Sequence, residues 1–328
     1  MKRKHVLRKI LLISGVLLGV LAIGWEIVWH YRSSPENYIS MDSANPLITE
    51  KTLLCAHRSG GGVYPEESLP AFRNCAESTA FHTDFFEFDL HLTKDDQLVL
   101  MHDDSLDRTT DSRTVFGEPG VIVRDKTLEE LKQLNIGARF ITDDGEMPYY
   151  EYSGDNVPDD LRILTLNEAL DYLTGIDQYH YIIEIKDGGA DGILASDILY
   201  EQLKARDLLN CAIICSFHDE VLDYVDKKYP DALRGAGVNE TLEFILAAGL
   251  KDKDYTAECD AVQLPYGDPK AAKGLNLGLV GIVNYAHAHD VAVQYWTIND
   301  VDDMKYLKSI RVDVIMTDYP EKLAEVLF

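Results

Sequence analysis

The feature that most constrains the fold of this chain is a regular alternation of strand-length apolar runs with helical patterns. In the second half of the chain the apolar runs lie at 181–186, 212–216, 233–237, 261–264, 291–296 and 312–316. Strands that alternate with helices form parallel sheets. Two earlier apolar runs, 52–57 and 85–92, bring the strands to the number that closes a (β/α)8 barrel. The sequence therefore predicts an α/β fold of the TIM-barrel type.

A further apolar run at 98–102 follows the second predicted strand after a short polar segment around Asp95. This segment is too short for a crossover helix, so 85–92 and 98–102 should form an antiparallel hairpin. Folding the chain about Asp95 sets His102 across from Phe88. The barrel should therefore carry one extra, returning strand.

Charged side chains occur within two of the predicted strands, where burial makes them expensive. Alternate residues of a strand share a face, so Glu87 and Asp89 point to one side, as do Glu184 and Lys186. The neighbouring residues are apolar, so these inward charges need partners. Carboxylates without cysteine favour a hard cation, Mg²⁺ or Ca²⁺. We therefore expect Glu87, Asp89 and Glu184 to bind a divalent metal.

Two histidines and an arginine lie where strands end. His57 ends the first predicted strand and Arg58 follows it, while His102 ends the hairpin. Barrels of this type place their sites at the carboxyl ends of the strands. Paired imidazoles beside a metal can act as general acid and general base, while Arg58 and Lys186 can bind phosphoryl oxygens.

These motifs, in this order, resemble those of the glycerophosphodiester phosphodiesterase family. The resemblance rests on Cys55-Ala56-His57-Arg58, Pro65-Glu66-Glu67-Ser68, Glu87-Phe88-Asp89, His102-Asp103, Ile183-Glu184-Ile185-Lys186, Ser216-Phe217, Tyr295-Trp296-Thr297-Ile298-Asn299 and Thr317-Asp318. It spans roughly residues 51–328. Two positions depart from the family pattern, since Ser59 stands where the family has Gly and Glu67 where it has Asn.

The resemblance implies hydrolysis of a glycerophosphodiester to glycerol 3-phosphate and an alcohol, with His57 and His102 as the catalytic pair. It also implies that Trp296 forms an aromatic wall against the glycerol moiety. Attack by water and attack by the glycerol 2-hydroxyl, which gives a cyclic phosphate, both stay open, as does which histidine is the acid.

Two alternatives remain at this stage. One is a lysophospholipase D or cyclising phosphodiesterase that acts on lipids, and the other is a non-catalytic, membrane-tethered binding barrel. The complete set of charged motif residues argues against the second alternative, because an inactive barrel should have lost at least one of them.

The first 30 residues differ from the rest of the chain. A basic segment, 1–9, precedes an apolar run over 10–30 that is long enough to span a bilayer. The basic flank predicts a single-pass anchor with a cytoplasmic N-terminus and an extracytoplasmic catalytic domain. A cleaved signal peptide is the alternative. A polar stalk over 31–50 would then lead to the barrel, 51–328.

The charge of the chain excludes one class of partner. The whole chain carries −25 and residues 1–33 carry +5, which leaves −30 for the remainder. Such a domain repels phosphate polymers, so we expect no nucleic acid as a partner. The expected partner is a small-molecule or lipid-derived glycerophosphodiester.

One long excursion interrupts the alternation of strands and helices. Residues 103–164 are rich in Gly, Pro and acidic residues, with one helix predicted near 127–134. Insertions of this length are often functional. We expect a subdomain over the barrel mouth that shapes substrate choice.

Overall fold

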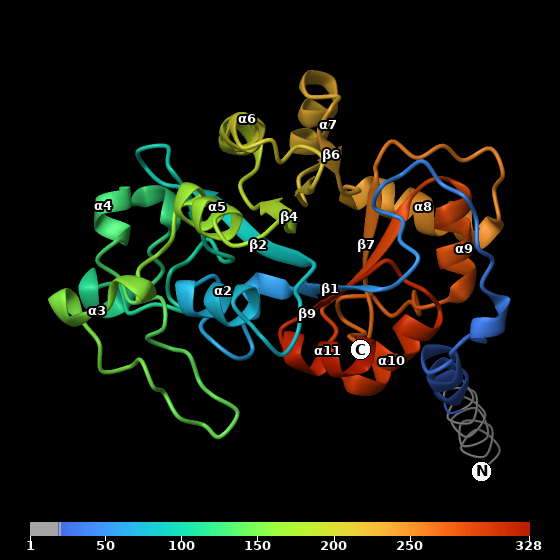
Figure 1. Ribbon diagram of the computed structural model, residues 1–328, viewed down its shortest axis with the longest axis horizontal. Helices are drawn as coiled ribbons and strands as arrows, with labels where there is room; N and C mark the ends of the chain where they lie inside the picture. Colours follow the sequence, from blue (N-terminus) through green and yellow to red (C-terminus); the bar gives the residue numbers. More distant parts are fainter. Residues whose placement is uncertain (1–18, 20) are drawn as a thin grey trace, which may run out of the picture.

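Eight parallel strands form a barrel in the computed structural model, which describes residue 19 and residues 21–328 (Figure 1). The strands are β1 (Leu53–Ala56), β2 (Phe85–Leu92), β4 (His180–Ile185), β5 (Ala212–Cys215), β6 (Leu233–Arg234), β7 (Ala261–Pro265), β8 (Ala292–Trp296) and β9 (Val314–Thr317). Their order is β6-β5-β4-β2-β1-β9-β8-β7. A parallel bridge between Gly235 and Ala261 joins β6 to β7 and closes the barrel. The predicted TIM-type barrel is confirmed.

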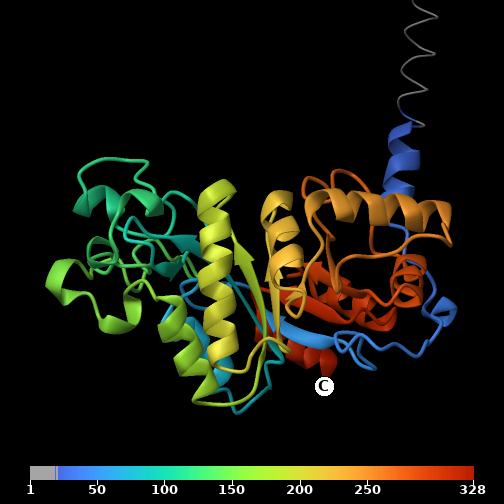
Figure 2. The same cartoon turned by 90° about the horizontal axis from the view of Figure 1, so that it is seen from above.

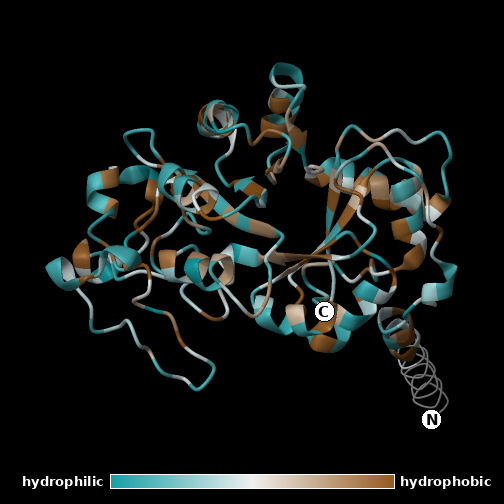
Figure 3. Ribbon diagram, in the orientation of Figure 1, coloured by the Kyte–Doolittle hydropathy of each residue, from teal (hydrophilic) through white to brown (hydrophobic). Residues whose placement is uncertain are grey.

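Helices cover the outside of this barrel (Figures 1 and 2). They are α2 (Leu69–Ala76), α5 (Leu166–Thr174), α6 (Gly189–Ala205), α7 (Asp219–Lys228), α8 (Val238–Leu250), α9 (Val280–Ala288), α10 (Val301–Ser309) and α11 (Pro320–Leu327). The strand side chains that point outward from the barrel, towards the surrounding helices, are apolar and buried, as Phe86 and Phe88 of β2 illustrate. Figure 3 shows the central strands largely in the colours of hydrophobic residues.

The returning strand has the predicted register. β3 (Leu98–Leu100) pairs antiparallel with β2, and Leu90 lies opposite Leu100. The amide of Met101 donates to the carbonyl of Asp89 at 3.1 Å, which continues the same register. His102 therefore follows the hairpin across from Phe88, beside the carboxylates of β2.

The insertion 103–164 has an apolar core of its own, built on β3. Its short helices are α3 (Ser112–Val115), η3 (Val123–Asp125), α4 (Leu128–Leu131), η4 (Gly154–Asn156) and η5 (Asp159–Leu161). Buried side chains such as Val121 and Leu131 pack on Val99 and Met101. The insertion consequently lies beside the barrel, at the left in Figure 1. Among the residues that the structure describes, none from 103–164 lines the cavity at the barrel mouth. The insertion therefore does not form the expected subdomain over the mouth.

The expected anchor falls partly outside the described residues. Segment 1–9 and, within 10–30, residues 10–18 and 20 are not described, while residues 21–29 form a helix. Within residues 19 and 21–328, no helix is both long and apolar enough to cross a bilayer.

Residues 31–50 pack on the barrel rather than forming a free stalk. The Ser33 hydroxyl accepts a hydrogen bond from the amide of Val280 at 2.8 Å, and η1 (Pro35–Asn37) follows it. Leu47 is 2% exposed and packs with Phe85 among the inward-facing residues of the barrel. Tyr38, Leu47 and Ile48 explain the difference, because these apolar side chains of the segment pack against the domain.

Candidate active site

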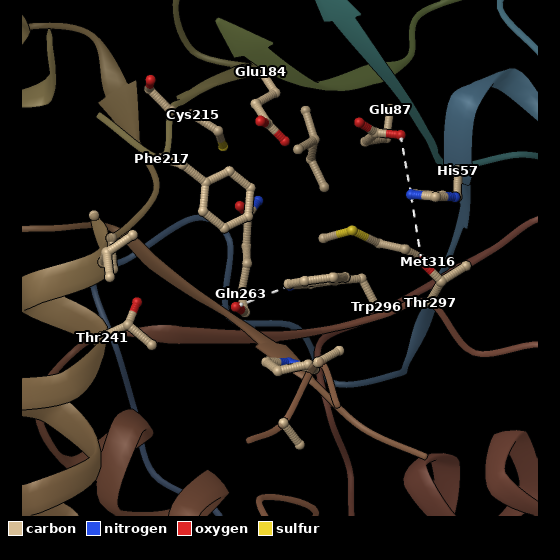
Figure 4. A pocket seen from close by; sticks show the side chains of 18 of the residues that line it. His57, Glu87, Glu184, Cys215, Phe217, Thr241, Gln263, Trp296, Thr297 and Met316 are labelled. Carbon is tan, nitrogen blue, oxygen red and sulfur yellow. Dashed lines mark hydrogen bonds and ion pairs between the residues drawn. The ribbon is translucent and has the colours of Figure 1, made fainter. Parts of the chain in front are cut away.

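All eight residues that the sequence singled out line one cavity of about 520 Å³ at the carboxyl ends of the strands. They are His57, Arg58, Glu87, Asp89, His102, Glu184, Lys186 and Trp296. Figure 4 shows His57 and Glu87 on one side of this cavity and Thr241 of α8 on the opposite side. We call the first side, formed by all of these residues except Trp296, the charged wall.

The carboxylates of the charged wall converge because of strand register. Asp89 of β2 lies directly opposite Glu184 of β4, and Glu87 lies two residue pairs earlier on the same face of β2. Glu87 and Asp89 are 5% and 1% exposed. Among the described residues, both Asp89 side-chain oxygens are buried without a hydrogen-bond partner, and the buried Glu184 Oε1 has only the Lys186 ammonium beside it. A cluster of this kind demands a positive charge.

Burial and mutual repulsion keep these carboxylates from ionising alike. Burial, reinforced by Asp89, raises the pKa of Glu87 to about 7. Burial also raises the pKa of Glu184, again with Asp89 adding to the effect. For Asp89, burial acts in the same direction but is outweighed by Lys186, His102 and Arg58, so its pKa is lowered. Negative charge therefore concentrates on Asp89.

The donor set of this cluster suits a hard divalent cation, since carboxylate oxygens are the ligands that Mg²⁺ and Ca²⁺ prefer. Within the described residues, however, no three acidic, histidine or cysteine side chains already converge in the geometry of a metal site. The Lys186 ammonium explains this, because Nζ lies 2.7 Å from Glu184 Oε1 and 3.4 Å from Asp89 Oδ1. The unpartnered Asp89 oxygens fit a cation, and the Lys186 ammonium supplies one positive charge beside them.

His57 is held between two carboxylates. Its Nδ1 lies 2.6 Å from Asp318 Oδ1, and its Nε2 lies 3.9 Å from Glu87 Oε2 and 3.4 Å from the Thr297 hydroxyl. Burial would lower its pKa, but Glu87 and Asp318 outweigh burial and raise it. Because Asp318 occupies Nδ1, Nε2 is the ring nitrogen that faces the cavity.

His102 is oriented by a chain of ion pairs that reaches into the insertion. Its Nδ1 lies 2.6 Å from Asp103 Oδ1, and Arg108 binds both Asp103 and Glu66, the latter at 2.7 and 2.8 Å. Burial would raise the pKa of Asp103, but Arg108 and His102 lower it to about 2. The pKa of His102 itself is lowered, first by burial and then by Arg58 and Lys186, against the opposing effect of Asp89.

The loop that carries Arg58 adopts a left-handed backbone at three positions that are not glycine. Arg58, Ser59 and Glu67 have φ angles of 46°, 64° and 58°. This turn aims the Arg58 amide at Glu87 Oε2 at 2.7 Å, and Glu67 Oε1 accepts from the Asp89 amide at 2.7 Å. Gly and Asn adopt such angles with less strain than other residues. The two departures from the family pattern, Ser59 and Glu67, therefore both fall at left-handed positions.

The side of the cavity opposite the charged wall is mainly apolar, with Thr241 and Lys273 as its polar lining residues. It is formed by α8 and by the segment that follows β7, through Val238, Leu242, Ile245, Ala272, Leu275 and Leu277. We call these residues the apolar wall. Trp296 lies between the two walls, and the Phe217 ring stands edge-on to it at a centroid distance of 6.2 Å. Trp296 Nε1 donates to the carbonyl of Gln263 at 3.1 Å, which fixes the indole.

Sequence reasoning gave no role to three residues that orient the histidines. Asp318 and Asp103 were noted only as parts of motifs, although each ends or follows a strand and lies against an imidazole Nδ1. Their position at strand ends was a usable signal. Arg108 had no such signal, because its partners come from separate segments of the chain.

A parallel barrel whose mouth holds two oriented histidines, an arginine and a buried carboxylate cluster has the features of a hydrolase that acts on phosphate esters. A model of the Glycerophosphoryl diester phosphodiesterase family matches residues 57–322. The chain belongs to this family. It is 30% identical over 279 residues, 84% of this chain and 98% of its relative, to a glycerophosphodiester phosphodiesterase of Caldanaerobacter subterraneus. It is 28% identical to one of Bacillus subtilis, over 86% of this chain and 88% of that relative.

Solved structures share the fold at lower identity. A glycerophosphodiester phosphodiesterase from Agrobacterium tumefaciens superposes with a TM-score of 0.61 at 18% identity, covering 84% of this chain and all of its own. A phosphodiesterase of Oleispira antarctica, solved in complex with the product sn-glycerol-3-phosphate, has a TM-score of 0.61 at 22% identity. It covers 84% of this chain and 96% of its own. The predicted family is thus confirmed, and with it the expectation that the chain is an enzyme.

Proposed function

We propose that this protein hydrolyses glycerophosphodiesters to glycerol 3-phosphate and an alcohol, with the help of a divalent cation. The observation that carries the proposal is the convergence of His57 and His102 on one buried carboxylate cluster, in a chain of this family. The named activity of the relatives of Caldanaerobacter subterraneus and Bacillus subtilis supports it.

The charged wall supplies the chemistry. Arg58 and Lys186 bind the phosphoryl oxygens, and one histidine removes a proton from the nucleophile while the other protonates the leaving oxygen. Asp318 and Asp103 fix the two rings through their Nδ1 atoms. Glu87, Asp89 and Glu184 would hold Mg²⁺ or Ca²⁺, which supplies Lewis-acid stabilisation of charge on the phosphoryl group. Trp296 packs against the glycerol moiety.

The N-terminal segment adds a proposal about location. The basic residues of 1–9 and the apolar run over 10–30 support a single-pass membrane protein with its N-terminus inside and its barrel outside the cytoplasm. Protease added to intact cells tests this orientation. Digestion of the barrel domain is expected, and protection until the membrane is permeabilised would reverse the orientation.

Turnover of glycerophosphocholine by the full chain tests the function. The wild-type protein should release glycerol 3-phosphate and stop when a chelator is added. Glu87→Ala should lose ~10³-fold or more of this activity and most divalent-cation binding by calorimetry. The matched control is Glu220→Ala, which removes a carboxylate that is 57% exposed and outside the cavity. Full turnover in excess chelator would overturn the metal proposal, and no release of glycerol 3-phosphate would overturn the function.

A further inference from the structure

The three parts of a glycerophosphodiester need three different places in the cavity. The proposed function puts the phosphoryl group against Arg58 and Lys186 and the glycerol moiety against Trp296. The alcohol is the third part, and the side that remains for it is the one formed by α8 and the segment after β7. The side chains on that side should therefore decide which alcohol the enzyme accepts.

Two polar side chains interrupt this mainly apolar side. Thr241 comes from α8, and Lys273 comes from residues 266–279 between β7 and α9, which we call the mouth segment. Figure 4 shows Thr241 across the cavity from His57 and Glu87. The acidic side chains that line the cavity in the described part of the chain all belong to the charged wall. Among the described residues, the alcohol side therefore carries one cation and no anion.

A cationic alcohol finds no complementary charge on this side. Aromatic rings can bind an ammonium group over their faces, and Phe217 and Trp296 are the lining residues that could do so. The Lys186 ammonium, however, already lies 5.7 Å from the centroid of the Phe217 ring, and the proposed function places glycerol against Trp296. An alcohol with a negative charge can instead accept hydrogen bonds from the Lys273 ammonium and the Thr241 hydroxyl.

The mouth segment is held from outside the cavity by the N-terminal helix, residues 21–29. The Asn276 side-chain amide donates to the carbonyls of Val28 and Tyr31 at 3.0 and 2.7 Å. Both of these carbonyls belong to the end of the helix or to the residues that follow it. The asparagine thus ties the segment that lines the cavity to the N-terminal part of the chain.

A second contact with this helix lies directly beside the lysine. Gly274 has a φ of 76°, and a Cβ added to it would lie 2.5 Å from the Trp25 ring, so only glycine permits the close approach of the indole. Lys273 has a φ of 48°, so two successive left-handed residues turn the chain here. Because the helix packs against this turn, it fixes the point from which the Lys273 side chain leaves the backbone.

We propose that Lys273 selects glycerophosphodiesters whose alcohol carries a negatively charged group, and that the N-terminal helix holds the lysine in position. This inference rests on the proposed function and names its substrate class. The domain as a whole is acidic, so its long-range field repels anions. The preference must therefore come from a short-range contact, and the lysine acts on the binding of the alcohol rather than on the bond that breaks.

The test compares two substrates that differ by one carboxylate. The full chain is given glycerophosphoserine or glycerophosphoethanolamine, and kcat/KM is measured for each through release of glycerol 3-phosphate. Lys273→Met should lower the ratio of the serine to the ethanolamine substrate about 3- to 5-fold, the effect of losing one exposed ion pair. Lys273→Glu should lower the ratio by ~10-fold or more, because repulsion replaces attraction.

The matched control is Lys270→Met. Lys270 is an exposed lysine of the same mouth segment and is not among the described residues that line the cavity. Both variants lose one positive charge, so an effect of the long-range field would change the ratio alike in both. The ratio should stay at the wild-type value in Lys270→Met, and the same loss in both variants would overturn this inference.

The part assigned to the N-terminal helix has its own variant. Asn276→Ala should lower the same ratio by ~2-fold, because the mouth segment loses the hydrogen bonds that hold it. Ser43→Ala breaks a contact between residues 31–50 and Asp290, away from the mouth segment, and should leave the ratio unchanged.

The outcomes separate this inference from the function on which it rests. Release of glycerol 3-phosphate from both substrates with the same ratio in wild type and Lys273→Met would overturn the role of the lysine alone. A wild-type ratio in Asn276→Ala would overturn the role of the helix. Absence of release from either substrate would overturn the proposed function itself.

Discussion

The two walls of the cavity are built in different ways. The charged wall consists of strand residues and the residues that follow strands, placed by backbone register, as the pairing of Asp89 with Glu184 shows. The apolar wall consists of helix and loop residues from α8 and the segment after β7, placed by side-chain packing. The charged wall is thus fixed by the hydrogen-bonded sheet, whereas the apolar wall depends on how α8 is held. A substitution that shifts α8 can therefore alter how the substrate fits against the apolar wall without moving the reacting groups of the charged wall.

The largest expected effect concerns the attachment of α8. Arg234 is 2% exposed, lies at the end of β6 and binds Asp226 of α7 and Glu240 of α8. Arg234→Met should lower the free energy of unfolding by ~2–3 kcal/mol, because Asp226 and Glu240, whose side chains are 36% and 27% exposed, lose the buried guanidinium that both of them bind. Urea unfolding measures this change. The control is Arg113→Met, whose ion pair is 54% exposed on the arginine side and should cost less than ~1 kcal/mol.

The pH dependence of unfolding is a second test of how Arg234 holds α8. Burial alone would raise the pKa of Glu240, but its bonds to Arg234 outweigh burial and lower it. A lowered pKa in the folded state means that the carboxylate stabilises the fold fully above the ordinary glutamate pKa of about 4.3. That contribution is lost as the pH falls through the lowered value. Arg234→Met should therefore flatten the pH dependence of stability in this range, and an unchanged pH profile would show that α8 is held by other contacts.

The second prediction concerns the charged wall. His57→Ala and His102→Ala should each lower kcat by ~10²-fold or more, with little change in divalent-cation affinity. A diester with a very good leaving group should rescue only the variant that has lost the general acid. His82→Ala is the control, since its side chain is 57% exposed and lies outside the cavity. Equal rescue of both variants would contradict the division of roles between the two histidines.

The positions of the charged-wall residues could be predicted from the sequence because a small number of simple backbone rules determine them. Period-two alternation placed Glu87 and Asp89 on one face, and the length of the hairpin turn placed His102 opposite Phe88, as the register of β2 and β3 confirms. Carboxyl ends of parallel strands meet at one end of a barrel, which brought His57 to the same cavity.

The apolar wall could not be predicted in this way. The four-residue spacing of Leu242, Leu246 and Leu250 is typical of a helix face that packs against a core. Their exposure follows from the position that α8 takes at the barrel mouth, which depends on contacts between distant segments. The lateral placement of the insertion and the ion pairs of Arg108 depend on tertiary packing in the same manner.

The smallest expected effect concerns the loop beside Arg58. Ser59 has a φ of 64° and is fully buried, and its hydroxyl finds no hydrogen-bond partner within the part of the chain that the structure describes. Ser59→Gly should raise the free energy of unfolding by about 1 kcal/mol, because relief of left-handed strain exceeds the added entropy of the unfolded chain. Ser59→Ala removes the hydroxyl and keeps the strained backbone, so urea unfolding should show no comparable gain. If both variants gain alike, the unpaired hydroxyl rather than the backbone is the source of the cost.

The closure of the barrel has a consequence for how the molecule opens on slow timescales. β6 has two residues, and it meets β7 through a single bridge from Gly235 to Ala261, whereas β2 and β4 share six residue pairs. Separating β6 from β7 therefore breaks far fewer backbone hydrogen bonds than separating β2 from β4. Amide protons along this seam should exchange with solvent at a lower energetic cost than those of the β2–β4 ladder. The barrel can therefore yield between β6 and β7, where α8 begins, while Asp89 and Glu184 keep their register.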